Sequence, residues 1–165
     1  MRGTRVVFLA SLALTAACVD PGRVTMPAPF TRDASPLPRL GRAVQSLAEL
    51  RQWRERWRDA RIVRYRVVQE VSCFCSRGGV RVLEVSDTVV SRAWDRATGR
   101  EVRPDGLDKT VGQLLDYAVS VVEAGGYVAA AFDPWYGYPL DIYIDPLISW
   151  ADDEVMYRLS TLTPS

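Results

Sequence analysis

Two stretches of the chain repeat their apolar residues every three or four positions, and each begins with a helix-capping sequence. The first starts at Ser46-Leu47-Ala48-Glu49 and the second at Thr110-Val111-Gly112-Gln113, where hydroxyl and carboxylate or amide oxygens can accept from free N–H groups of the first turn. The second ends at Gly125-Gly126, a typical helix stop. The pattern predicts two amphipathic helices, each with one face in the core. Their apolar faces comprise Leu47, Leu50, Trp53, Trp57 and Ala60 in the first helix and Val111, Leu114, Leu115, Ala118, Val121 and Val122 in the second.

Elsewhere the apolar residues alternate with polar ones, which is typical of strands that bury one face. The strands predicted in this way cover residues 63–71, 80–85, 89–94, 128–132, 140–144 and 155–161. We therefore expect an α+β domain of order αβββαβββ, with a single antiparallel sheet of about six strands and two helices on one face. The other face of the sheet is then partly in contact with water.

The N-terminal region follows neither pattern. Arg2 and Arg5 accompany an apolar run from Val6 to Leu14, which is typical of a signal peptide and too short to span a bilayer. The following residues, Thr15-Ala16-Ala17-Cys18, complete a sequence that resembles the lipobox of bacterial lipoproteins. This resemblance implies that Cys18 receives a diacylglyceryl group and becomes the new N-terminus. The alternative is ordinary signal cleavage with Cys18 incidental.

We expect three segments: a signal peptide at residues 1–17, the lipidated cysteine with a Pro-rich tether at 18–45, and the folded domain at 46–165. A tether of this length spans about 30 Å as a coil. Two acyl chains give stable anchoring, because each buried methylene contributes about 0.8 kcal/mol.

The expected location is extracytoplasmic, in the bacterial cell envelope. The lipid bilayer is the expected partner of Cys18, and an envelope protein is a further candidate partner.

The amino-acid composition excludes several classes of reaction and binding site, but it does not identify a function. Of the 165 residues 48% are hydrophobic and 25% charged, and the formal net charge of +1 gives no indication of nucleic-acid binding. Lys109 is the only lysine beside 20 arginines. The chain has no histidine, which excludes Ser-His-Asp and Cys-His nucleophiles and imidazole metal sites. We therefore expect no enzymatic activity, no cofactor and no metal.

Arginines form a second stripe on the first predicted helix, at Arg51, Arg54, Arg58 and Arg61. Such a row can bind anionic lipid or an acidic partner. A solvated helix face is the favoured interpretation, because acidic residues on the same helix partly balance the charge.

Three short motifs occur in a fixed order along the domain: Cys73-Phe74-Cys75, Gly137-Tyr138-Pro139 and Asp152-Asp153-Glu154. With Trp57 and Tyr65 before them, they resemble a family of secreted bacterial domains of unknown function, over roughly Leu47 to the C-terminus. The resemblance implies an envelope-located α+β domain, often on a lipoprotein tether, and it implies no activity.

Cys73 and Cys75 are the most informative pair of side chains. On an extended strand they share one face, while Phe74 points to the other. Their Cα atoms are then about 6.6 Å apart, near the upper end of the range for a disulfide, so a bond between them requires a local turn. An oxidising compartment favours its formation. Three interpretations remain: a local structural disulfide, a redox-active pair and a soft-metal site for Cu(I).

The segment from Phe132 to Pro139 combines turn residues with four aromatic side chains. Trp135, Tyr136 and Tyr138 are candidates for binding a partner, because Trp and Tyr dominate protein interfaces. The blander interpretation, which we favour, is that the aromatic residues cover the end of the core. Of these side chains, Trp135 is the one expected to be exposed.

Asp152-Asp153-Glu154, with Asp141 and Asp145 nearby, is the only acidic cluster. Carboxylates can act in acid–base catalysis or bind Ca²⁺, but a polar hairpin is the favoured interpretation.

The sequence leaves two classes of function open. The first is a non-catalytic accessory domain that binds a protein or has a structural role. The second is a thiol–disulfide or soft-metal-handling accessory that uses Cys73 and Cys75.

Overall fold

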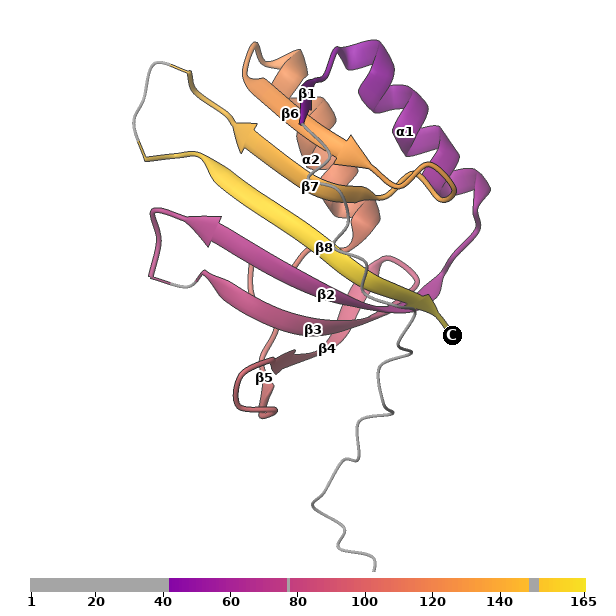
Figure 1. Cartoon of the computed structure of the whole chain (residues 1–165), viewed down its shortest axis with the longest axis vertical. Coiled ribbons are helices and arrows are strands. Elements are labelled where there is room, and N and C mark those ends of the chain that lie inside the picture. The colour runs from indigo at the N-terminus through magenta and orange to yellow at the C-terminus, as the bar shows by residue number, and fades with distance from the viewer. Residues whose placement is uncertain (1–41, 77, 149–151) are drawn as a thin grey trace, which may run out of the picture. The chain divides into compact units, whose positions relative to one another are not determined.

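A single antiparallel sheet and two helices make up the part of the chain that the computed structural model describes, residues 42–76, 78–148 and 152–165 (Figure 1). The predicted signal peptide, Cys18 and nearly all of the predicted tether lie outside these residues. The helices are α1 (Leu47–Asp59) and α2 (Val111–Glu123). The strands are β1 (Ala43–Val44), β2 (Arg64–Cys73), β3 (Gly79–Ser86), β4 (Val89–Asp95), β5 (Glu101–Val102), β6 (Tyr127–Phe132), β7 (Pro139–Asp145) and β8 (Val155–Pro164).

The sheet has eight strands, so the prediction of about six is wrong in number although right in class. Their spatial order is β1-β6-β7-β8-β2-β3-β4-β5. The six predicted strands are present, and they form two meanders that meet where β8 pairs with β2. The two additional strands, β1 and β5, each have two residues and lie at the edges of the sheet. Two residues cannot display an alternating pattern, which is why the sequence did not indicate them.

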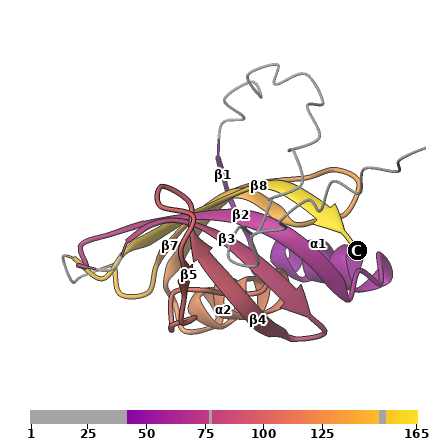
Figure 2. The same ribbon diagram turned by 90° about the horizontal axis from the view of Figure 1, so that it is seen from below.

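Both helices cover the same face of the sheet (Figure 2). Their buried residues join the inward-facing residues of the long strands in one core cluster. Leu50, Leu114 and Leu115 from the helices and Leu83 and Ile142 from the strands are fully buried. The expected arrangement of two helices on one face is thus found.

Each helix begins as its capping box predicts. Ser46 accepts a hydrogen bond from the backbone N–H of Glu49, and Thr110 accepts one from the N–H of Gln113. In turn, the side-chain oxygens of Glu49 and Gln113 accept hydrogen bonds from the backbone N–H groups of the two N-cap residues. Neither α1 nor α2, the helices of the described residues, is long and apolar enough to cross a membrane.

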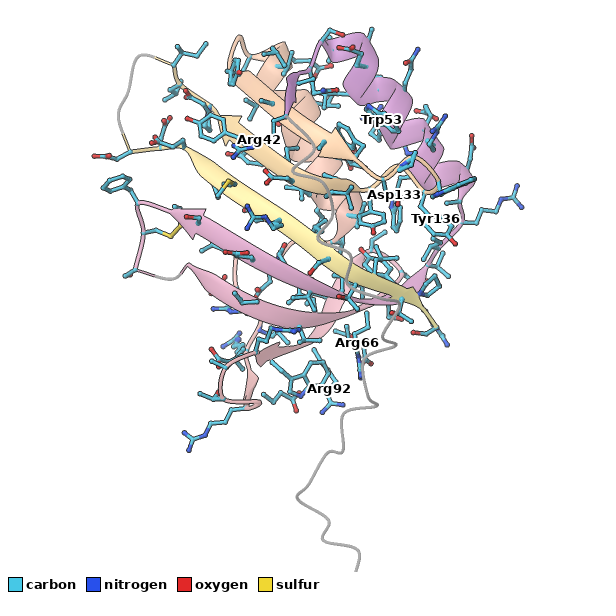
Figure 3. All side chains as sticks on the ribbon, viewed as in Figure 1. Arg42, Trp53, Arg66, Arg92, Asp133 and Tyr136 are labelled. Atoms are coloured by element: carbon cyan, nitrogen blue, oxygen red, sulfur yellow. A yellow bond between two sulfur atoms is a disulfide. The ribbon has the colours of Figure 1, made fainter. Side chains whose placement is uncertain are left out.

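Arg42, Arg66 and Arg92 lie on the face of the sheet opposite the helices (Figure 3). Trp94 of β4 is only 7% exposed there, because the guanidinium groups of Arg66 and Arg92 lie 5.3 and 4.7 Å from its ring. Arg66 pairs with Glu84, and Arg92 pairs with Glu101. The two guanidinium groups therefore shield an aromatic ring on a face expected to be partly wet.

Candidate functional site

The aromatic segment between β6 and β7 is a closed turn held by its first polar residue. One carboxylate oxygen of Asp133 accepts hydrogen bonds from the backbone N–H groups of Trp135, at 3.0 Å, and Tyr136, at 2.7 Å. The N–H of Gly137 donates to the Asp133 carbonyl, and the N–H of Asp133 donates to the Tyr138 carbonyl. These four bonds fix the backbone from which the aromatic side chains project.

This turn is docked on α1 at Gly137. Gly137 has φ +80°, and an added Cβ would lie 3.0 Å from the side chain of Arg56 and from the carbonyl oxygen of Trp53. A glycine is required here both for the left-handed conformation and for the close approach. Arg56 completes the contact, because its guanidinium donates a 2.7 Å hydrogen bond to the Pro134 carbonyl.

Trp53 connects the turn to the core. Its ring stacks on Phe132, with centroids 4.7 Å apart and planes 12° apart, and the Arg56 guanidinium lies 5.1 Å from the same ring. The helix and the turn therefore share one continuous stack of planar groups.

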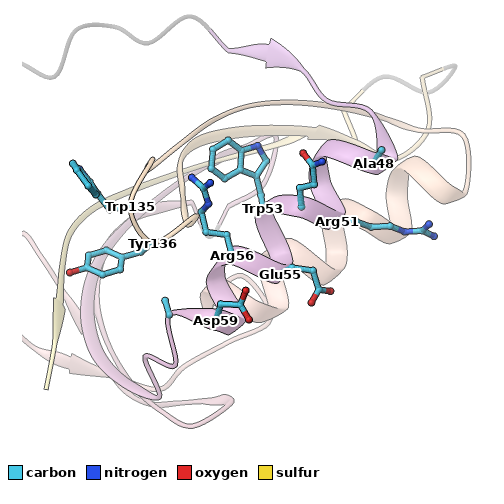
Figure 4. Close-up of a pocket in the computed structure, with 10 residues that line it drawn as sticks. Ala48, Arg51, Trp53, Glu55, Arg56, Asp59, Trp135 and Tyr136 are labelled. Atoms are coloured by element: carbon cyan, nitrogen blue, oxygen red, sulfur yellow. The ribbon is translucent and has the colours of Figure 1, made fainter.

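The candidate partner-binding residues fall into two groups. Trp135 is 82% exposed and Tyr136 is 43% exposed, whereas Tyr138 is buried at 9% in the core cluster. Figure 4 shows Trp135 and Tyr136 extending from the turn away from α1, with Arg56 between the turn and Trp53. A groove of about 1030 Å³ runs between the two aromatic side chains and the exposed face of α1. The expected exposure of Trp135 is found, and Tyr138 has the core role that we favoured for the whole segment.

The arginine stripe of α1 is largely paired. Arg51 reaches Glu123 and Arg54 reaches Asp116, so two of its members bridge α1 to α2. Arg58 pairs with Glu55 within the helix. These pairs agree with a charge-balanced helix face.

Cys73 and Cys75 lie at disulfide distance at the end of β2, with their Cα atoms 5.1 Å apart. This separation is shorter than that of an extended strand, because β2 ends at Cys73 and the chain bends over the next residues. Cys75 and the intervening Phe74 are exposed, Phe74 at 78%, whereas Cys73 is half-buried.

A pocket of about 400 Å³ brings this cysteine pair together with the acidic cluster. Its wall combines the end of β2, the loop before α2, one side chain of α2 and the start of β8. The residues that line it are Cys73, Phe74, Cys75, Gly106, Leu107, Lys109, Tyr117, Asp152, Asp153, Glu154, Val155 and Tyr157. Two motifs that are separate in sequence thus form one site. Lys109 and Tyr117 also belong to it, and no local pattern indicates their contribution.

The loop before α2 is held by buried polar contacts. Arg81 of β3 pairs with Asp108, which is 7% exposed, and with Asp105. Desolvation lowers the pKa of the Arg81 guanidinium, but the two carboxylates outweigh it and raise the pKa above its ordinary value. Gln69, 1% exposed in β2, accepts from the backbone N–H of Lys109. These contacts fix the loop that forms one wall of the pocket.

The described part of the chain contains no group of side chains that could serve as metal ligands. No three Cys, Asp or Glu side chains are grouped there so that they could hold a metal ion. The sequence prediction of a polar hairpin around Asp152-Asp153-Glu154 agrees with their position between β7 and β8.

Comparison with known proteins identifies one family. The model of a family of unknown function, DUF6174, matches residues 49–164. No curated protein and no solved structure matches the chain.

Proposed function

The chain belongs to the DUF6174 family of unknown function, and we propose that it acts as a membrane-anchored envelope lipoprotein whose folded domain binds another protein without catalysing a reaction. The match begins near the start of α1 and includes nearly the whole sheet. The residues proposed for anchoring precede it.

The anchoring part of the proposal rests on the N-terminal sequence. A short basic start, an apolar run and the order Ala16-Ala17-Cys18 favour cleavage before the cysteine and its acylation. The Pro-rich residues that follow favour a tether between bilayer and domain.

The binding part rests on one observation: Trp135 is 82% exposed although the turn that carries it is fixed by four hydrogen bonds. Exposure of a Trp side chain to water is unfavourable, and the side chain contributes strongly to the free energy of binding when a partner covers it. Because the backbone is already ordered, binding here loses little conformational entropy. Tyr136 beside it adds a second aromatic surface with a hydroxyl that can hydrogen-bond to the partner.

Polar side chains around this pair fit the rim of an interface. Gln52, Glu55 and Asp59 line the α1 side of the groove. An apolar centre with a mixed polar rim is typical of protein–protein interfaces and gives orientation to the bound partner.

Intact-mass analysis of the full chain extracted from membranes tests the anchoring. The expected result is a chain that begins at Cys18 and carries acyl groups. A soluble chain without lipid would contradict the anchored form and leave a secreted domain.

Substitution of Trp135 by alanine tests the binding surface. After cross-linking in cells, we expect the Trp135→Ala variant to lose a partner that the unchanged protein retains, while its stability changes by no more than about 0.5 kcal/mol, as for other exposed sites. Phe74→Ala is the matched control, because Phe74 is similarly exposed at 78% but lies at the cysteine pair. Retention of all partners by Trp135→Ala would refute this surface.

A second candidate function is thiol–disulfide exchange or soft-metal handling by Cys73 and Cys75. The observation that favours exchange is the exposure of Cys75 beside its half-buried partner. Titration with a thiol redox buffer tests it: a midpoint above about −300 mV would support exchange, and a more negative one would support a structural disulfide. A partner that is retained irrespective of redox state supports protein binding.

A further inference from the structure

The β4–β5 hairpin (residues 89–103) carries three exposed arginines, Arg96 and Arg100 in the connection and Arg103 directly after β5. None of the three makes an ion pair with a carboxylate of the described residues. Most arginines elsewhere in the described segments are paired, since eight of them take part in the ten salt bridges. The hairpin thus concentrates positive charge that has no carboxylate partner.

Both carboxylates of the β4–β5 hairpin are already used within it. One carboxylate oxygen of Asp95 accepts hydrogen bonds of 2.7 Å from the backbone N–H and from the hydroxyl of Thr98. Glu101 binds the guanidinium of Arg92 through both of its oxygens, at 2.9 and 2.7 Å. These contacts leave the three other arginines of the hairpin available to an anion from outside the domain.

The backbone that carries these arginines is ordered before any ligand binds. The N–H of Asp95 donates to the Arg100 carbonyl, and the N–H of Gly99 donates to the Asp95 carbonyl, both at 2.9 Å. On β4, the Arg92 guanidinium lies 4.7 Å from the ring of Trp94 and so holds this part of the hairpin on the sheet. Binding therefore has to order only the arginine side chains.

The position of the hairpin suits a flat anionic surface. β5 is the last strand of the sheet, so the hairpin forms an outer edge. Its three unpaired arginines line neither the groove at Trp135 nor the pocket at Cys73. A guanidinium group pairs with phosphate oxygens through two hydrogen bonds, and each arginine close to an anionic bilayer adds to the attraction. Exposed arginines on an edge reach the phosphates of a bilayer, whereas a bound peptide is usually enclosed by a groove.

We propose that the β4–β5 hairpin docks the domain on the headgroup phosphates of anionic lipids, with Arg96, Arg100 and Arg103 as the contacting residues. This inference rests on the proposed membrane anchoring, because an anchored domain meets the bilayer at a high effective concentration and weak contacts then suffice. It does not involve the surface at Trp135.

Hydrogen exchange of residues 95–103 tests the docking. The protein extracted from membranes is reconstituted in vesicles of phosphatidylcholine, either alone or with about 30% phosphatidylglycerol. We expect exchange to slow at least about threefold in the anionic vesicles, because docking protects the hairpin. At about 0.5 M NaCl the exchange should return to its rate in neutral vesicles, since salt screens attraction between exposed charges.

Two double variants separate the hairpin from a general charge effect. Arg96→Gln/Arg100→Gln should lose most of the slowing by anionic lipid. Arg61→Gln/Arg64→Gln is the matched control and should retain it, because these two arginines are also exposed and make no ion pair in the described segments. Arg64 begins β2 near the β3–β4 turn, at the opposite end of β4 from the hairpin connection.

Equal exchange in the two kinds of vesicle, slowing that persists at high salt, or equal losses in the two double variants would each overturn the proposal. Two soluble anions test the other sources of the same chemistry in neutral vesicles. Slowing by millimolar inorganic phosphate would assign a free-phosphate site, and slowing by polyglutamate would assign an acidic protein partner; either result would overturn docking on the bilayer.

The intact mass distinguishes failure of this inference from failure of the anchoring. An acylated chain whose hairpin exchanges equally in both vesicles leaves the anchoring intact and removes the docking. A chain without acyl groups contradicts the anchoring, and its sedimentation with phosphatidylglycerol vesicles then tests the hairpin alone. In that case binding that Arg96→Gln/Arg100→Gln weakens at least about tenfold supports the hairpin, and absence of binding overturns it.

Discussion

The hydroxyl oxygen of Tyr65 accepts a hydrogen bond from the backbone N–H of Val111 at 2.8 Å. Tyr65 lies in β2 and is 2% exposed, and Val111 is the first residue of α2. This N–H is one of those at a helix N-terminus that have no partner within the helix. Trp57 of α1 packs edge-on against the same tyrosine ring, with centroids 5.5 Å apart. One side chain of the sheet therefore contacts both helices.

Replacement of Tyr65 by phenylalanine should lower the free energy of unfolding by about 1–2 kcal/mol, because the buried N–H of Val111 loses its partner while the ring packing remains. Urea denaturation measures the change. Tyr136→Phe is the control, since Tyr136 is exposed and should change stability by less than about 0.5 kcal/mol. Equal stability of Tyr65→Phe and the unchanged protein would show that the bond does not support the helix.

Alkaline pH should destabilise the fold as buried tyrosines are forced to ionise. Desolvation raises the pKa of Tyr65 to about 12, against an ordinary value of 10.0, and it does the same for Tyr138. Both groups stay protonated in the folded state while the unfolded chain loses the protons from pH 10 upward, so stability falls between about pH 10 and 12. Urea midpoints measured across this range should decrease, and the decrease should be smaller in Tyr65→Phe. A flat profile would contradict the burial of these hydroxyls.

Alanine at Gly137 should both strain the turn and push it away from α1. Its φ of +80° disfavours a side chain by about 1–2 kcal/mol, and the added Cβ would meet Trp53 and Arg56 at 3.0 Å. Gly99→Ala isolates the first effect, because Gly99 has φ +67° and open space around its Cβ position. We expect Gly137→Ala to lower the free energy of unfolding by about 1 kcal/mol more than Gly99→Ala does. Equal losses in urea denaturation would mean that the turn moves freely on α1.

Removal of Arg81 should loosen the loop that leads into α2. Arg81→Ala leaves the buried Asp108 carboxylate without its charged partner, which we expect to cost about 3 kcal/mol of stability. Arg58→Ala is the comparison, because Arg58 pairs with Glu55 at the surface of α1, where ion pairs contribute about 1 kcal/mol at most. Hydrogen exchange of residues 103–110 should rise in the first variant only. Similar losses for both would place Asp108 in a solvated environment.

Local patterns predicted local structure well in this chain. The capping boxes at Ser46 and Thr110 predicted where the helices start, and alternation located six strands. Each of these signals is contained in a few consecutive residues. The predictions failed where the partner is remote. The two-residue strands β1 and β5 exist only through pairing with β6 and β4.

The two candidate sites were predictable to different degrees, because the residues of one are close in sequence and those of the other are remote. Trp135 and its turn are contained in one short segment, so their exposure followed from turn chemistry and residue type. The pocket beside Cys73 combines residues about 80 positions apart, since Asp153 reaches it only through the β2–β8 pairing. Sequence spacing contains no information on such a juxtaposition.

Replacement of both Cys73 and Cys75 by serine should leave the domain folded. The two residues are separated by only one position, so the disulfide removes little entropy from the unfolded chain, and its contribution should remain well below the roughly 3 kcal/mol of a 15-residue loop. The core cluster is otherwise complete without the sulfur atoms, since Cys73 packs at its margin and Cys75 is exposed. Circular dichroism and thermal melting should therefore show a cooperative transition close to that of the unchanged protein. Loss of folding would instead make the pair a structural requirement, and a stable variant that loses its cellular phenotype would direct attention to the chemistry of the two thiols.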